Sequence, residues 1–201
     1  DHFKYDMVMG GRRQVGSTIK PFLYALAMQN GMTPCTTAPN IQRSYGNWTP
    51  RNGSRARYGQ QVPLRWGLQQ SNNWISAYLI SLLGPSQFVN ILHDFGLNNP
   101  DIDKNATPVL CLGPSELSVG EMCSAYTTFV NHGVRCAPLF VTRIEDSHGN
   151  IVAKFQPLMN EVISEESSFK MLDMLQAVIQ GGTGGRLRYN YHLTGEIGGK
   201  T

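Results

Sequence analysis

Apolar residues recur at spacings of three and four along much of this chain, which is the pattern of helices that bury one face. Clusters of Gly, Pro, Ser, Asn and Asp stand between these segments and interrupt regular structure. The pattern predicts helices over 17–30, 63–70, 74–83, 85–96, 118–131 and 164–181. The chain is therefore expected to be of mixed α/β class, with helices dominating its middle.

Two of these helices have recognisable starts. Ser118 and Glu121 fit a capping box, in which the serine side chain and the glutamate three residues later satisfy each other's backbone N–H groups. Ser164 is expected to cap the last helix, whose inward face is predicted to carry Phe169, Leu172, Leu175 and Ile179.

Other segments lack the helical pattern. Residues 139–145 and 151–155 flank a turn-forming run, 146–150, and are predicted to form a β-hairpin. Residues 193–201 are glycine-rich and extended. Residues 32–61 show no periodicity, and a loop of that length in a compact domain is usually functional. The aromatics in and beside it either line a groove or pack locally: Tyr45, Trp48, Tyr58 and Trp66.

Composition and charge exclude several classes of structure and function. A chain of 201 residues that is 41% hydrophobic can fill a core, so disorder is excluded. The net charge of +3 is too small to indicate a nucleic-acid-binding surface. The longest apolar stretches, 22–28 and 74–83, fall short of the roughly 18 residues that span a bilayer, and no secretory signal pattern is present.

Nothing in the spacing of His or Cys predicts a metal site. The cysteines contain no C-x-x-C pair, and the histidines other than His2 show no ligand spacing. Cys123 is expected to be a small buried residue on an apolar helix face. The cysteines leave three disulfide pairings open: Cys35, Cys111, Cys123 and Cys136.

Ser17 and Lys20 stand three residues apart at a predicted helix start, which places a hydroxyl and an amine on one face. A lysine can activate a serine nucleophile if burial or neighbouring positive charge lowers its pKa. Pro21 has no N–H to donate to the Ser17 carbonyl, so the first turn is expected to be loosened. A second S-x-x-K, from Ser167 to Lys170, lies inside an ordinary amphipathic helix and is interpreted as coincidental.

Two further motifs offer matching chemistry. Ser71-Asn72-Asn73 joins two helices and is either a proton relay for a departing amine or simply a helix cap. Lys200-Thr201 suits a substrate carboxylate, or is an exposed strand lysine. A P-loop is excluded because Thr194 stands where the first glycine is required.

The order S-x-x-K, S-x-N, K-T is the set of motifs of penicillin-binding proteins and class A β-lactamases. With the longer strings 11–22, 68–73 and 112–131, the chain resembles the transpeptidase domain of a bacterial class A, bifunctional, penicillin-binding protein. The resemblance covers essentially all of residues 1–201. It implies an antiparallel sheet flanked by helices, with a helical subdomain beside it.

The resemblance also implies roles. Ser17 would attack the penultimate carbonyl of a peptidoglycan stem peptide ending in D-Ala-D-Ala, and β-lactams would acylate it likewise. Lys20 would take the serine proton, and Asn73 would orient Lys20 and the substrate amide. An acceptor amine from a neighbouring strand would then resolve the acyl-enzyme.

Three residues complete the implied site. Ser71 would pass a proton to the departing D-Ala, Lys200 would tune it and contact the substrate, and Thr201 would hold the terminal carboxylate. No cofactor, metal or nucleic acid is implied. Family members are membrane-anchored outside the cytoplasm, in the periplasm of many bacteria, and often carry an upstream glycosyltransferase domain.

The chain departs from the family pattern in places. Val15 stands where proline is usual, which is expected to loosen the approach to Ser17 slightly. The family motif continues Lys-Thr-Gly, and one oxyanion donor lies just beyond that glycine. Residues 1–201 are therefore expected to be a partial domain, without the N-terminal strands and the strands and helix after this motif. Loss of one oxyanion donor costs about 10²–10³ in rate.

Other functions remain as alternatives. A class A β-lactamase, by the resemblance, places a loop glutamate about 36 residues after the S-x-N serine, where this chain has Thr107. A D,D-carboxypeptidase shares the three motifs but not the longer strings. A non-catalytic penicillin-sensing module, in which the acylated serine signals, and a plain helical core domain are the alternatives outside enzymes.

Overall fold

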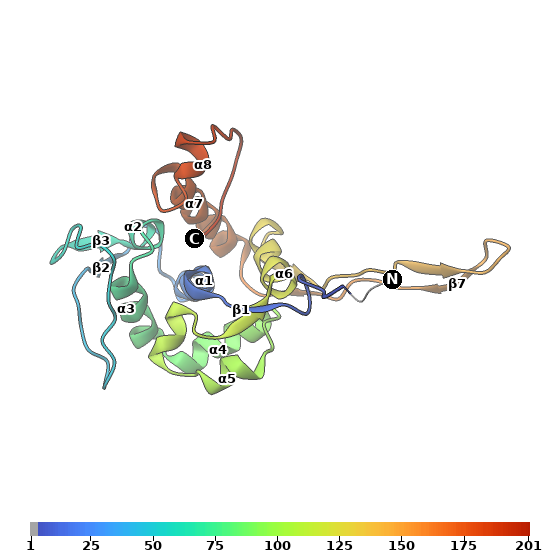
Figure 1. Cartoon of the computed structure of the whole chain (residues 1–201), viewed down its shortest axis with the longest axis horizontal. Coiled ribbons are helices and arrows are strands. Elements are labelled where there is room, and N and C mark those ends of the chain that lie inside the picture. Colours follow the sequence, from blue (N-terminus) through green and yellow to red (C-terminus); the bar gives the residue numbers. More distant parts are fainter. Residues whose placement is uncertain (1–3) are drawn as a thin grey trace.

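The computed structural model describes residues 4–201, and helices make up most of its regular structure (Figure 1). Its helices are α1 Lys20–Gln29, α2 Leu64–Gln69, α3 Asn73–Leu83, α4 Pro85–Asp94, α5 Pro100–Lys104, α6 Val119–Val130, α7 Glu165–Gly181 and α8 Arg186–Tyr189, with 3-10 turns η1 Gly16–Ile19 and η2 Pro108–Leu112. Its strands are β1 Arg12–Gln14, β2 Thr37–Pro39, β3 Gln61–Pro63, β4 Glu116–Ser118, β5 Val134–Cys136, β6 Arg143–Glu145, β7 Ile151–Lys154 and β8 Met159–Glu161.

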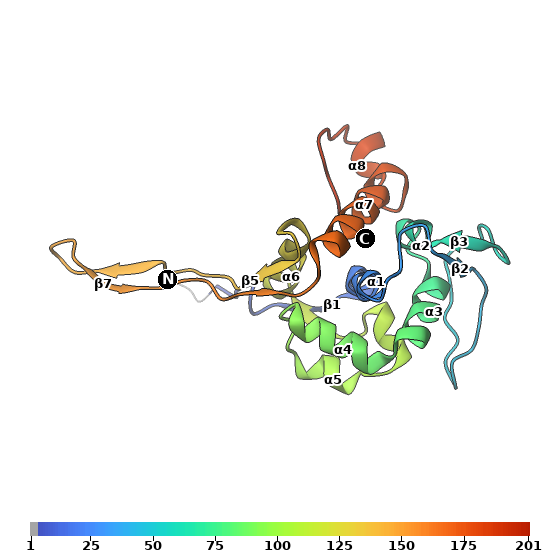
Figure 2. The same ribbon diagram turned by 180° about the vertical axis from the view of Figure 1, so that it is seen from behind.

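Helix α1 lies at the centre of the molecule, where α3, α4 and α7 pack around it (Figure 1, Figure 2). Its residues from Lys20 to Met28 are all buried, so it is enclosed on every side rather than on the one face that the sequence predicts. A cluster of aromatic rings closes the core between α1, α4 and α6, namely Phe22, Phe95, Tyr126 and Phe129. The central position of α1 fixes the residues at its first turn against several elements at once.

The strands form four separate antiparallel pairs, β1–β4, β2–β3, β5–β8 and β6–β7. The hairpin predicted over 139–155 is confirmed as β6 and β7, and it extends away from the helices in both views (Figure 1, Figure 2). Within residues 4–201 no larger sheet is assembled, so the helical part of the expected architecture is the part that the described chain contributes.

The predicted helices are confirmed, with differences at single residues. The capping box of Ser118 and Glu121 is present in full, and α4 begins at Pro85. The predicted inward face of α7 is wrong at Phe169, whose side chain is 74% exposed. Leu175 and Ile179 are buried as predicted and Leu172 is partly buried against the core, and the buried face also includes Met171 and Met174.

The cysteines correct one expectation. All four are free, Cys111 is buried, and Cys123 is exposed rather than buried. Among the described residues no single helix is long and apolar enough to cross a bilayer; only α3 and α4 together meet that test, and they are bent by 95° at their junction.

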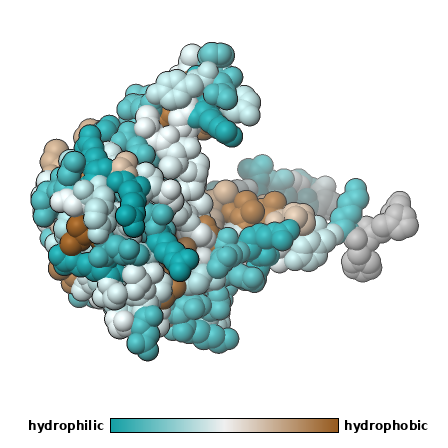
Figure 3. All heavy atoms as spheres, turned by 60° about the vertical axis from the view of Figure 1, so that its left-hand side comes forward, coloured by the Kyte–Doolittle hydropathy of each residue, from teal (hydrophilic) through white to brown (hydrophobic). Residues whose placement is uncertain are grey.

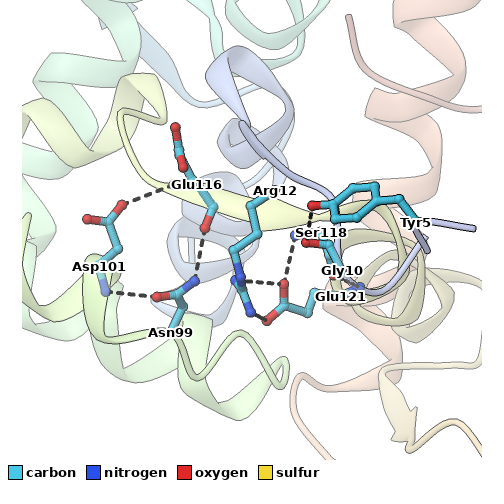
Figure 4. Close-up of polar contacts among 8 residues, drawn as sticks. All are labelled: Tyr5, Gly10, Arg12, Asn99, Asp101, Glu116, Ser118 and Glu121. Carbon is cyan, nitrogen blue, oxygen red and sulfur yellow. Dashed lines mark hydrogen bonds and ion pairs between the residues drawn. The ribbon is translucent and has the colours of Figure 1, made fainter. Parts of the chain in front are cut away.

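The pairing of β1 with β4 anchors the residues that lead into α1. Gln14 pairs with Glu116 in the register. Figure 4 shows the polar contacts at this pairing: Arg12 forms an ion pair with Glu121 at 3.2 Å, and Asn99 donates a hydrogen bond to the Glu116 carbonyl at 2.9 Å. Asp101 accepts from the Glu116 backbone N–H at 3.0 Å. Contacts from α5 and α6 thus fix the strand that ends three residues before Ser17.

Candidate active site

The Lys20 ammonium is the centre of a hydrogen-bonded cluster beneath the surface. Lys20 is fully buried, and its Nζ donates to the Ser71 carbonyl at 2.7 Å, to the Ser71 Oγ at 3.3 Å and to the Asn73 Oδ1 at 2.6 Å. Three residues that the sequence analysis selected, from two motifs more than fifty positions apart, are therefore brought into direct contact.

The surroundings of Lys20 make its ammonium a stronger acid than that of an ordinary lysine. Burial, and then the positive charge of Lys200, lower its pKa to about 7. Cys111 lies close by, and burial raises the pKa of its thiol to about 12, so the thiol stays neutral at neutral pH. A sizeable fraction of Lys20 is therefore a neutral amine near pH 7, which can accept a proton.

Ser17 lies in η1, one turn before α1. Its carbonyl accepts the backbone N–H of Lys20, the i to i+3 bond of a 3-10 turn. Pro21 has no N–H for the α-helical alternative, but the turn closes in the tighter 3-10 form, so the loosening predicted from the sequence is not observed. The Ser17 side chain is half-buried, and no hydrogen bond of its Oγ is found among the described residues.

The turn that carries Ser17 is fixed from three directions. Val15 N–H donates to the Ser115 carbonyl at 3.1 Å, and Gly16 N–H donates to the Gly113 carbonyl at 3.0 Å. Tyr126 Oη, from α6, donates to the Thr18 carbonyl at 2.6 Å. The expected loosening by Val15 is thus offset, since proline at that position has no N–H for the bond to Ser115.

Gly113 permits the closest of these approaches. Its φ of +68° is in the left-handed region, and a Cβ there would lie 2.1 Å from the Gly16 carbonyl oxygen. Only glycine fits, so the string around residue 113 has a physical role beside the nucleophile turn.

The S-N-N motif is both a helix cap and part of the lysine cluster. Asn72 caps α3, because its Oδ1 accepts from the N–H groups of Trp74 and Ile75. Ser71 has φ of +52°, an uncommon conformation for a residue with a side chain, and its carbonyl and hydroxyl both face Lys20. The helix-cap interpretation is therefore confirmed for Asn72, and Ser71 contacts Lys20, while the proton-relay role of Ser71 stays a prediction.

Two asparagines that the sequence analysis missed hold this motif in place. Asn40 is fully buried, and its Oδ1 accepts from Asn72 Nδ2 at 2.8 Å. Asn52 accepts the backbone N–H of Asn73 at 2.6 Å. Both lie in the loop that the sequence marks only as long and functional, and its lack of periodicity gave no signal for individual residues.

Lys200 and Thr201 lie near the cluster, close enough for the Lys200 charge to act on Lys20. Burial lowers the Lys200 pKa to about 8, and its Nζ donates to the Thr201 carbonyl. Thr201 Oγ1 donates to Thr183 Oγ1 at 2.6 Å. The segment rests on α7, where Gly199 N–H donates to the Leu175 carbonyl at 3.2 Å. Thr183, in the glycine-rich turn after α7, is a further residue that the sequence analysis missed.

A cavity of about 250 Å³ opens beside the cluster. Its walls combine the S-N-N motif, the loop before α2 and the turn after α7. The lining residues are Asn52, Gly53, Ser54, Ala56, Trp66, Gln70, Ser71, Asn72, Asn73 and Thr183. Of the candidate aromatics, Trp66 reaches the cavity, whereas Tyr45 and Trp48 pack on each other.

The second S-x-x-K has a structural role. Ser167 and Ser168 are buried, Ser168 donates to the Phe129 carbonyl at 2.6 Å, and Lys170 pairs with Glu166 at 2.6 Å. Its lysine has a carboxylate partner, unlike the buried Lys20. The interpretation of this copy as coincidental is consistent with these contacts.

Comparison with known proteins gives the same family along the chain. The family described as "Penicillin binding protein transpeptidase domain" matches residues 5–201. Penicillin-binding protein 1A of Aquifex aeolicus is 30% identical over 189 residues, which is 91% of this chain and 25% of that protein. Penicillin-binding protein 1A of Vibrio cholerae is 29% identical and covers 100% of this chain and 28% of that protein. The chain spans about a quarter of the length of these relatives.

Solved structures show the same fold. The crystal structure of penicillin-binding protein 1A from Haemophilus influenzae has a TM-score of 0.80 at 26% identity, covering 92% of this chain and 33% of that one. A D,D-transpeptidase domain from Eggerthella lenta has a TM-score of 0.76 at 22% identity, covering 90% of this chain and 52% of that one. The expected fold class is confirmed. This chain belongs to the penicillin-binding protein transpeptidase domain family, with class A proteins among its relatives.

Proposed function

We propose that this chain carries the acyl-transfer site of a serine D,D-transpeptidase that crosslinks peptidoglycan stem peptides, with Ser17 as the nucleophile. The observation that carries the proposal is the buried Lys20, one turn after Ser17, with a pKa lowered to about 7 and with Ser71 and Asn73 as partners. A lysine in that state can serve as a general base near neutral pH.

The proposed acylation moves one proton at each step. Neutral Lys20 accepts the Ser17 hydroxyl proton as Oγ attacks the carbonyl of the penultimate D-Ala. The peptide C–N bond then breaks, and the departing D-Ala amine receives a proton through the Ser71 hydroxyl, which lies 3.3 Å from the Lys20 Nζ. The product is an ester on Ser17, and an acceptor amine attacks it to form the crosslink. A β-lactam acylates Ser17 by opening its own ring amide.

Lys200 and Thr201 are assigned to the substrate's terminal carboxylate. Lys200 offers a cation and Thr201 a hydroxyl on one short segment. Asn73, whose Nδ2 donates to the Arg51 carbonyl at 2.7 Å, orients Lys20 and contributes to binding the substrate amide.

We further propose that residues 1–201 form part of a larger transpeptidase domain. The chain covers only 52% of the Eggerthella lenta transpeptidase-domain structure. By analogy with the relatives, the whole protein would be a membrane-anchored cell-wall enzyme outside the cytoplasm, with an upstream glycosyltransferase domain. A β-lactamase is not favoured, since the residues that line the cavity include no carboxylate that could activate a water.

The test is intact-mass measurement after incubation with a β-lactam, on this chain and on a longer polypeptide that contains it. We expect a long-lived adduct that Ser17→Ala abolishes and that Ser167→Ala, in the second S-x-x-K, retains. An adduct that clears within seconds would indicate a β-lactamase. A folded longer polypeptide that stays unmodified would show that Ser17 is not the nucleophile.

A further inference from the structure

The part of the chain around the cavity is rich in positive charge. Between Asp6 and Asp94 the sequence has no acidic residue. The loop between β2 and β3 nevertheless carries several exposed arginines, namely Arg43, Arg51, Arg55 and Arg57. The face that carries β2, β3 and this loop comes forward in Figure 3 and is largely hydrophilic. An anionic ligand would therefore meet no competing carboxylate from these elements.

Arg57 differs from the other arginines of this loop in how its backbone is held. Its φ is +53°, an uncommon value for a residue with a side chain. Its carbonyl accepts Asn40 Nδ2 at 2.8 Å and the Gln60 N–H at 3.2 Å. Asn40 is the buried residue that also accepts from Asn72 of the S-N-N motif. One buried side chain thus fixes both Arg57 and the motif that contacts Lys20. Strain that is held in this way is typical of functional positions.

The Arg57 side chain lies over the ring of a residue that lines the cavity. Its guanidinium carbon is 5.5 Å from the centre of the Trp66 ring, and Trp66 lines the cavity together with Ser71 and Asn73. A cation over an aromatic face is oriented while its N–H donors stay available.

No ion pair among residues 4–201 involves Arg57. Arg65, the next arginine along the chain, contrasts with it, because Arg65 pairs with Asp173 at 2.9 Å. The Arg57 guanidinium is therefore free to bind an external anion.

We propose that Arg57 binds a carboxylate in the interior of the donor peptide, distinct from the terminal carboxylate assigned to Lys200 and Thr201. The planar guanidinium matches a carboxylate with two parallel hydrogen bonds. The amide and hydroxyl groups of Asn52, Ser54 and Gln70 suit the peptide groups that would lie between the two anchors. This inference rests on the proposed function and makes Arg57 a determinant of substrate specificity.

The test compares two donor peptides that share a D-Ala-D-Ala end. One carries a free carboxylate on an interior residue, and the other carries the corresponding amide. Acyl transfer is measured with the longer polypeptide described above, as wild type, Arg57→Gln, Arg57→Lys and Arg43→Gln. Arg43 is the matched control, because it is exposed in the same loop and its loss changes the net charge equally.

For the carboxylate peptide we expect Arg57→Gln to lower kcat/KM about tenfold, mainly through KM, as for loss of one charged hydrogen-bonding partner. The amide peptide should react equally with both proteins. Arg57→Lys should retain part of the preference for the carboxylate peptide. Arg43→Gln should leave kcat/KM unchanged for both peptides.

Two results would overturn the inference. If Arg57→Gln and wild type discriminate equally between the peptides while a β-lactam still acylates Ser17, Arg57 does not bind the carboxylate and the proposed function stands. If the folded wild type is not acylated on Ser17, the proposed function fails and the assignment of Arg57 fails with it.

Discussion

The Nζ of Lys20 lies 2.6 Å from the Oδ1 of Asn73, and this contact joins the first turn of α1 to the first residue of α3. The amide oxygen is one of the few acceptors that a fully buried ammonium has. It stabilises the charged form only partly, since an amide is neutral, and burial still lowers the lysine pKa to about 7. An asparagine rather than an aspartate at position 73 thus leaves the lysine able to give up its proton.

The pH dependence of acylation should be bell-shaped. The rate should rise as Lys20 loses its proton near pH 7, because only the neutral amine accepts the Ser17 proton. It should fall above about pH 8 as Lys200 loses the charge that binds the substrate carboxylate. Stopped-flow acylation by a carboxylate-bearing β-lactam checks both limbs. Replacing Lys200 with Gln should remove the falling limb, and a rate independent of pH between 6 and 9 would contradict both assignments.

Asn73→Asp should move the rising limb to higher pH. A carboxylate beside the Lys20 ammonium favours the charged form and raises its pKa. At pH 7 the acylation rate should fall about tenfold for each pH unit that the limb moves. The measurement is the pH–rate profile of the variant beside Asn73→Ala, which lacks the added charge. If Asn73→Asp and Asn73→Ala have the same profile, the charge at position 73 does not set the lysine pKa.

Gly113→Ala should displace the nucleophile turn. A non-glycine residue at φ +68° costs roughly 1–3 kcal/mol, and its Cβ would overlap the Gly16 carbonyl oxygen. We expect lower stability in urea unfolding together with slower acylation of Ser17. Gly46→Ala is the control, because it also has positive φ but has nothing within 4 Å of its Cβ. It should lose stability alone; equal loss of acylation in both variants would argue against the contact with Gly16.

Asn72→Ala should destabilise the fold by roughly 2–4 kcal/mol, as it removes the cap of α3 and leaves the Oδ1 of buried Asn40 without its donor. Acylation should slow as well, because Ser71 and Asn73 flank the lost residue. The comparison is Ser164→Ala, which removes the cap of α7 beside Gln29, at the opposite end of α1 from Lys20, and should cost about 1 kcal/mol with acylation unchanged. Unfolding midpoints and acylation rates measured on both variants decide the point.

The helices show how much of the structure local sequence patterns predict. The capping box of Ser118 and Glu121 and the helix start at Pro85 each act over one helical turn, so their effects were predictable. Phe169 was misplaced because the apolar residues of α7 allow two neighbouring phases, and only packing against the rest of the core selects one.

The residues of the candidate site also divide into those that the sequence predicts and those that it does not. Its motif residues were predictable, since the order of S-x-x-K, S-x-N and K-T is written in the chain. Asn40, Asn52 and Thr183 were not, because each acts through one contact with a residue distant in sequence and lies in a segment without periodicity.

The sequence by itself determined the helices, the family and the candidate reactive groups, because these depend on short-range spacing and on the order of motifs. The tertiary structure decided that Lys20 is enclosed with Ser71 and Asn73 and has a lowered pKa. That property depends on how many other elements exclude water from one side chain. Desolvation is the sum of contacts from distant segments, and no local pattern records it.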